Sequence, residues 1–267
     1  MKKPKIYLGT IALEKNRWSS RVPSYLVSEW LPQIKAAGFD GLELWENHVL
    51  SSPGEAEALK NSGFPIAIYN HYSTFSNSPE DIEKREKAVE MINFLGAGAI
   101  KFNVGNEPAL LGEYRDNVLR VADAIDGVMF CECHANTLLE FNDDIIDFFK
   151  DLCPEKFQLM VHPFIEPNLL DKKFEMFGTR LTHIHSQLTS DSGERICLDR
   201  WPQRVNACFD IMKKHSFAGN FTVEFTELTA SPGENIDDLF ANTIRDLTFI
   251  KRAAALPEGS GSGLCAL

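Results

Sequence analysis

Short apolar runs alternate along the chain with longer segments whose apolar residues recur at helical spacing. The short runs predict β-strands at residues 5–10, 39–44, 64–70, 99–103, 128–133, 157–161, 181–185 and 221–225. Strands that are apolar along most of their length are typical of a parallel sheet, because both faces of such a sheet are covered.

The intervening segments predict helices at residues 23–37, 54–61, 79–95, 110–125, 143–152, 168–177, 202–215 and 236–250. Residues 78–81, Ser-Pro-Glu-Asp, are a strong helix start, because proline suits the first helical position and acids suit the first turn. Gly38 marks a helix end. We expect residues 186–200 to form a long loop without regular structure.

Eight strand–helix units in about 250 residues predict a (β/α)8 barrel, the TIM barrel of the α/β class. The main alternative is an open, doubly wound sheet, but no glycine-rich G-x-G-x-x-G phrase follows the first strand. We therefore expect a single domain over residues 1–256. Residues 257–267 contain alternating Gly and Ser and predict a flexible tail.

Composition narrows the class of protein. The chain has 267 residues, 44% apolar and 24% charged, which is ordinary for a globular protein. No apolar run approaches the roughly 18 residues of a membrane span, and the N-terminus lacks a signal-peptide pattern. The six cysteines fall mostly within predicted strands and helices, as expected of reduced thiols in the cytoplasm. A net charge of −11 argues against a nucleic-acid partner.

Metal-ligand residues lie near the ends of four successive predicted strands: Glu132, His162, His185 and Glu224. The carboxyl ends of the strands form the active face of a TIM barrel, so these side chains are expected to meet there. Two carboxylates and two imidazoles suit one divalent ion, namely Mn, Zn, Co, Fe or Mg, with the softer ions favoured. The alternative is that each residue is an ordinary polar side chain of the barrel mouth.

Four phrases carry a family resemblance: AGFDGLELW at 37–45, CECHANTL at 131–138, LTHIHSQ at 181–187 and GNFTVEF at 219–225. They resemble the xylose isomerase-like TIM barrels, a superfamily of sugar isomerases, sugar phosphate isomerases and epimerases, and endonuclease IV. The resemblance covers roughly residues 5–255. It implies that Glu132, His185 and Glu224 are metal ligands.

The sixth strand departs from the family pattern. The family usually has Asp there, followed three residues later by His, whereas this chain has His162 and then Ile165. We expect His162 to be the fourth ligand, and Glu166 is an alternative. Replacing a carboxylate by an imidazole makes the ligand set less anionic and favours a softer metal.

The resemblance implies a metal-dependent isomerase or epimerase that transfers a proton next to a metal-bound carbonyl of a sugar, or of a sugar-like polyol or keto compound. Glu132 and Glu224 would be the acid/base pair. The alternatives are a dehydratase, lyase or hydrolase on a related substrate, and a non-catalytic sugar-binding barrel. An endonuclease is disfavoured, because the chain has only seven His and is acidic.

Several further residues are expected near the substrate. Candidates for binding substrate oxygens are His134, His183, Lys101, Arg195, His71 and Glu43. Arg195 lies where the family often has a substrate-contacting Arg, although it also reads as a solvated loop charge. Trp18, Trp45 and Phe75 could form an apolar wall or simply pack. We expect a small-molecule partner and no membrane or nucleic acid; association of the chain with itself stays open.

Overall fold

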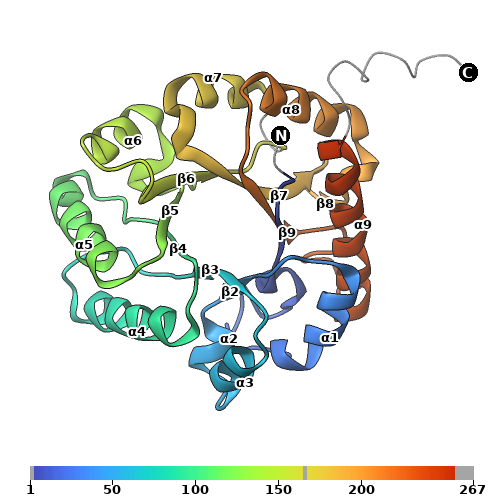
Figure 1. The fold of residues 1–267 in the computed structure, drawn as a ribbon, viewed down its shortest axis with the longest axis horizontal. Helices are drawn as coiled ribbons and strands as arrows, with labels where there is room; N and C mark the ends of the chain where they lie inside the picture. Colours follow the sequence, from blue (N-terminus) through green and yellow to red (C-terminus); the bar gives the residue numbers. More distant parts are fainter. Residues whose placement is uncertain (1–2, 165–166, 256–267) are drawn as a thin grey trace, which may run out of the picture.

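The strands close into a barrel, seen end-on in Figure 1. The computed structural model describes residues 3–164 and 167–255. The parallel barrel strands are β1 (Ile6–Gly9), β2 (Leu42–Trp45), β3 (Ile66–Asn70), β4 (Ala99–Phe102), β5 (Val128–Glu132), β6 (Phe157–Val161), β7 (Leu181–Thr189) and β9 (Asn220–Phe225). Neighbours pair in the order β6-β5-β4-β3-β2-β1-β9-β7, and β6 pairs with β7 to close the ring. The predicted (β/α)8 barrel is confirmed.

Helices form the outer ring in Figure 1. They are α1 (Val27–Ala37), α2 (Asn47–Leu50), α3 (Glu55–Asn61), α4 (Pro79–Leu95), α5 (Leu111–Ala124), α6 (Asn142–Phe149), α7 (Pro167–Phe177), α8 (Pro202–Lys214) and α9 (Ile236–Ala255), with 3-10 turns η1 (Thr10–Leu13), η2 (Pro108–Leu110), η3 (Leu138–Glu140), η4 (Gly178–Arg180) and η5 (Leu198–Arg200). Ser78 caps α4 by accepting a hydrogen bond from the Asp81 amide, and α1 ends at Gly38 with φ 86°, as the sequence predicts. Within the described residues, no helix is both long and apolar enough to cross a membrane.

The prediction of a loop at residues 186–200 is wrong over much of its length. Strand β7 continues to Thr189 and pairs antiparallel with β8 (Arg195–Ile196). Gly193, with φ 86°, allows the tight turn between them, and Leu188 is fully buried. Arg195 is the first residue of the second strand of this hairpin.

Apolar side chains fill two layers of the core. Between strands and helices lie residues such as Ile34, Leu42 and Val223, all fully buried. A second cluster of buried side chains is separate from that main core. It consists of Tyr7, Ile68, Ala99, Phe130 and Met160. The proposed tail at residues 257–267 lies outside the described residues, so the division into barrel and tail stays a prediction.

Candidate metal centre

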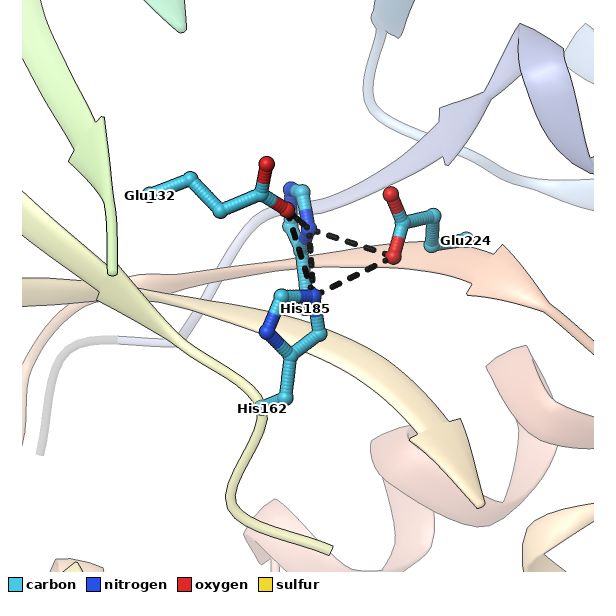
Figure 2. Close-up of side chains that lie close together, drawn as sticks. All are labelled: Glu132, His162, His185 and Glu224. Carbon is cyan, nitrogen blue, oxygen red and sulfur yellow. Dashed lines mark hydrogen bonds and ion pairs between the residues drawn. The ribbon is translucent and has the colours of Figure 1, made fainter. Parts of the chain in front are cut away.

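Four barrel strands bring Glu132, His162, His185 and Glu224 together (Figure 2). Glu132 is the last residue of β5, His162 directly follows β6, and the other two lie on β7 and β9. His162 Nε2 and His185 Nδ1 are each 3.3 Å from Glu132 Oε1 and 3.3 Å from Glu224 Oε2. The two nitrogens are 3.2 Å apart.

This spacing fits a single metal ion. Ligand atoms that bind one tetrahedral ion at roughly 2.0–2.1 Å lie about 3.3 Å from one another. The four candidate atoms all lie within 4.8 Å of one another. Glu132, His185 and Glu224 are buried, whereas His162 is half-buried and is the candidate ligand that solvent reaches most easily. The two nitrogen and two oxygen donors suit a borderline divalent ion.

The charges of the cluster depend on one another. Burial lowers the pKa of His185, but the carboxylates of Glu224 and Glu43 more than compensate, so this pKa lies well above its usual value. The pKa of His162 is raised in the same way, by Glu132 and Glu224 against burial. Burial raises the pKa of Glu132 and Glu224, yet the neighbouring cations leave both lowered. Two ionised carboxylates thus face a point where positive charge is favoured.

Glu43 on β2 holds His185 from behind. Its Oε2 lies 2.9 Å from His185 Nε2, and its Oε1 accepts a hydrogen bond of 3.2 Å from Asn70 Nδ2. A carboxylate that accepts the Nε2 hydrogen leaves Nδ1 free to face a metal. Glu43 is only 1% exposed. The structure therefore places Glu43 against the candidate ligand His185, not open to the mouth where a substrate oxygen would contact it.

Lys101 lies between the carboxylates of Glu132 and Glu224 and forms an ion pair with each. Its Nζ donates to Glu132 Oε2 at 2.8 Å and lies 3.9 Å from Glu224 Oε1. Asn103 Nδ2 also donates to Glu132 Oε2, at 3.2 Å. Burial lowers the pKa of Lys101, but the carboxylates, Glu132 foremost, leave it well above its usual value. Lys101 is a charged partner of the acid pair, with 2% of its surface exposed.

His183 lies beneath the centre. It is fully buried, its Nε2 is 2.9 Å from Thr222 Oγ1, and its ring stacks on Tyr7 with centroids 6.0 Å apart. Burial holds its pKa well below the usual value, so the ring is neutral. The structure does not bring His183 to the mouth, where it was expected to bind substrate.

His134 and His71 lie in contrasting places. The His134 amide donates to the Glu132 carbonyl at 2.8 Å, a tight turn that ends strand alternation, so the His134 side chain is exposed and does not join the cluster. His71 is buried, with Nδ1 2.7 Å from Glu46 Oε2. It lines a hollow of about 390 Å³ together with Tyr72, Asn103 and other polar residues.

The remaining residues expected near the substrate also differ in how far they are exposed. Arg195 is half-buried, donates to Thr189 Oγ1 at 2.6 Å and lies 5.7 Å from the Phe225 ring. Trp18 is 60% exposed and packs 5.3 Å from the same ring. Trp45 and Phe75 are fully buried and serve packing. Only Trp18 of the expected apolar wall presents most of its surface to solvent.

No protein-family model and no curated protein matches the sequence. Solved structures do match. The chain has the fold of the xylose isomerase-like TIM barrels. A structure titled IOLI protein with a bound zinc atom has a TM-score of 0.68 and 11% sequence identity, over 94% of this chain and 100% of that one.

Two further solved structures that match carry names of different activities. A probable 3-DHS dehydratase, AsbF of Bacillus anthracis, has a TM-score of 0.66 and 17% identity over 91% of this chain and 98% of that one. A D-tagatose 3-epimerase-like protein has a TM-score of 0.64 and 13% identity over 93% and 98%. At these identities the likeness concerns the fold.

Sequence reasoning missed part of this candidate site. It did not find Glu46, the partner of His71, and it expected Glu43 to contact substrate where the structure pairs it with His185. Both residues come from the phrase LELWE at 42–46, at the second strand. Two acids three residues apart at a strand end were the available signal. Glu166, the alternative fourth ligand, lies outside the described residues.

Proposed function

We propose that this protein is a divalent-metal-dependent isomerase or epimerase that moves a proton next to the carbonyl of a sugar or sugar-like keto compound. The observation that carries the proposal is the placement of Glu132 and Glu224. Their carboxylates approach the same two imidazole nitrogens at 3.3 Å from different strands, β5 and β9. Two bases beside one point are what proton removal and return require.

Glu132, His162, His185 and Glu224 would hold the ion. A bound divalent ion supplies polarisation of a carbonyl and its neighbouring hydroxyl, which makes the adjacent C–H more acidic. The mixed nitrogen and oxygen donor set favours a softer ion, and the zinc-bound IOLI structure supports this choice.

The protein's own groups prepare the acid pair. Lys101 and Asn103 donate to Glu132 Oε2, so they fix the carboxylate plane and leave Oε1 facing the centre. The lowered pKa values of both Glu residues keep them ionised, so either can accept a proton. One ionised Glu would take a proton from one side of the substrate carbon. The other Glu, after taking a proton from solvent, would return it from the opposite side, and the first Glu would then release its proton to solvent.

Metal-assisted dehydration is the second candidate function. It also begins with a proton taken from the carbon next to a carbonyl, and it needs a second group to protonate the departing hydroxyl. His71 would be that acid; its pairing with Glu46 and its place in the hollow beside Asn103 support this role. The likeness of the fold to that of the probable 3-DHS dehydratase supports this second candidate function.

Glu132→Gln and Glu224→Gln test the main proposal. Each keeps the side-chain shape and removes the base, and general acid–base steps contribute about 10²–10⁴-fold in rate. The metal-loaded protein, incubated with free ketoses in D₂O, should place deuterium next to the carbonyl, and both variants should lose at least about 100-fold of this rate.

Metal content must be measured in the same samples, because weaker metal binding would also slow exchange. Glu57→Gln, an exposed acid on α3, is the matched control and should exchange at the wild-type rate. Turnover to a dehydrated product supports the second candidate. Wild-type protein that binds metal and ketose but yields neither exchange nor any isomerised product contradicts the main proposal.

A further inference from the structure

Arg21 presents a guanidinium group without an acidic partner at the barrel mouth. Its central carbon lies 4.6 Å from the Tyr72 ring and 5.5 Å from the Trp45 ring. Among residues 3–164 and 167–255, no carboxylate forms an ion pair with it and no acceptor takes a hydrogen bond from its side chain. By contrast, Arg17 in the same segment is 2.6 Å from Glu234.

This lack of a partner is unusual for a half-buried cation in so acidic a chain. The protein has 38 Asp and Glu residues against 27 Lys and Arg residues, so carboxylates are plentiful. A guanidinium group has five N–H donors in a fixed plane, and the side-chain nitrogens of Arg21 still reach solvent, so these donors are available to a ligand. Stacking on two aromatic rings orients the group and partly removes its water.

The backbone holds Arg21 in a strained conformation. Its φ is 58°, in the left-handed region that non-glycine residues seldom adopt. Two hydrogen bonds maintain it, from the Arg21 amide to the Asn16 carbonyl at 3.0 Å and from Asn47 Nδ2 to the Arg21 carbonyl at 2.7 Å. Strain that the surroundings maintain in this way is found mainly at binding and catalytic sites.

Arg21 is also close to the metal centre. The Tyr72 ring that it contacts lies 5.6 Å from Lys101 Nζ, which donates to Glu132. One aromatic ring therefore connects the guanidinium group to the acid pair.

We propose that Arg21 binds an oxyanion, a carboxylate or a phosphate, at the end of the substrate remote from the reacting carbon. The planar donors of arginine match both groups in bidentate fashion. The inference rests on the proposed function, because it takes the Glu132–Glu224 pair as the reacting end. It adds that the substrate is a sugar acid or a sugar phosphate, not a neutral sugar.

Binding of three matched probes tests this. D-Fructose, D-fructuronate and D-fructose 6-phosphate differ only at the sixth carbon and are titrated calorimetrically into the full-length, metal-loaded protein. At least one anionic probe should bind about tenfold more tightly than fructose, and added NaCl should reduce the difference. Tighter binding of D-fructuronate would indicate recognition of a carboxylate, and tighter binding of D-fructose 6-phosphate would indicate recognition of a phosphate.

Arg21→Gln should abolish this preference, and Arg21→Lys, which keeps the charge but not the planar fork, should retain part of it. Lys15→Gln, an exposed cation of the same segment, is the matched control and should keep the full preference. If Arg21→Gln fails to fold, judged by its thermal midpoint, Arg21→Lys alone carries the test. Equal affinity for all three probes, or binding of none, overturns the inference, and so does a preference that survives Arg21→Gln.

Deuterium exchange on the same probes separates this inference from the proposed function. Tight, Arg21-dependent binding of an anionic probe without exchange or isomerisation leaves the role of Arg21 standing and contradicts the isomerase proposal. Conversely, deuterium exchange on fructose and on both anionic probes, with equal affinity for all three, supports the isomerase proposal and contradicts the role of Arg21.

Discussion

Glu43 Oε2 and His185 Nε2 lie 2.9 Å apart, on the side of the imidazole that faces away from Glu132 and Glu224. The contact fixes both the orientation of the ring and the nitrogen that carries hydrogen. Since β2 and β7 are far apart in sequence, the contact also ties the metal centre to the opposite wall of the barrel.

Glu43→Gln should weaken metal binding without removing a ligand. Loss of such a supporting carboxylate costs about 10–100-fold in metal affinity. Competition titration with a chromophoric chelator measures the change. Glu57→Gln should bind metal as the wild type does, and unchanged affinity in Glu43→Gln would show that the contact does not orient His185.

Lys101→Met should destabilise the metal-free protein strongly. The substitution leaves Glu132 buried without its closest cation, and breaking a buried pair in this way costs about 3–5 kcal/mol. Addition of metal should recover part of the loss, because the ion then neutralises the same carboxylate. Urea unfolding with and without metal measures both effects.

Lys84→Met is the control for that experiment. Lys84 pairs with Glu80 on the exposed face of α4, and such pairs contribute about 0.2–1 kcal/mol at most. A Lys101→Met protein as stable as Lys84→Met in the absence of metal would mean that Lys101 does not hold the acid pair.

Metal binding should tighten as pH rises. The pKa values of His162 and His185 are raised in the metal-free fold, so at pH 6 both rings carry protons that a metal must displace. Titration with Mn²⁺ at pH 6, 7 and 8 should give increasing affinity and, in two buffers of different ionisation enthalpy, proton release. Affinity independent of pH would exclude these imidazoles as ligands.

Asp246 should make the protein less stable as pH rises. It is fully buried on α9, where its Oδ1 accepts from the Leu198 amide at 2.8 Å, and burial raises its pKa to about 8. The unfolded chain loses this proton near its ordinary pKa of about 3.9, whereas the folded chain keeps it to about 8. The free energy of unfolding therefore falls between these values, by up to about 1.4 kcal/mol per pH unit from this group.

Asp246→Asn removes the ionisable group and should flatten that slope, so the variant gains on the wild type between pH 5 and pH 8. Urea unfolding at pH 5, 6, 7 and 8 measures the difference. Asp237→Asn, an exposed acid of the same helix, should follow the wild-type curve. Parallel curves for wild type and Asp246→Asn would contradict the raised pKa.

Strand periodicity was sufficient to predict the barrel, because eight apolar runs separated by amphipathic segments have few alternative folds. It was also sufficient to bring Glu132, His162, His185 and Glu224 to one rim, since strand alternation determines their shared side. Whether they bind metal stays a prediction.

Alternation failed where strands end. It placed His134 beside Glu132, but a backbone turn directly after β5 sends that side chain outward. Alternation also predicted that His183 lies at the mouth, because it shares a strand face with His185. Two residues along a strand move a side chain by one layer, so His183 lies in the layer below the centre. The pairing of β7 with β8 depended on a turn at Gly193 that has no periodic signal.

The floor of the barrel has a kinetic consequence. Neutral His183, stacked on Tyr7 and lying 5.3 Å from Phe130, seals the interior below the centre. Under the proposed function, the ion and the substrate would both reach the centre from the side of His162. We then expect ordered binding, with the ion entering first and the bound substrate slowing its release.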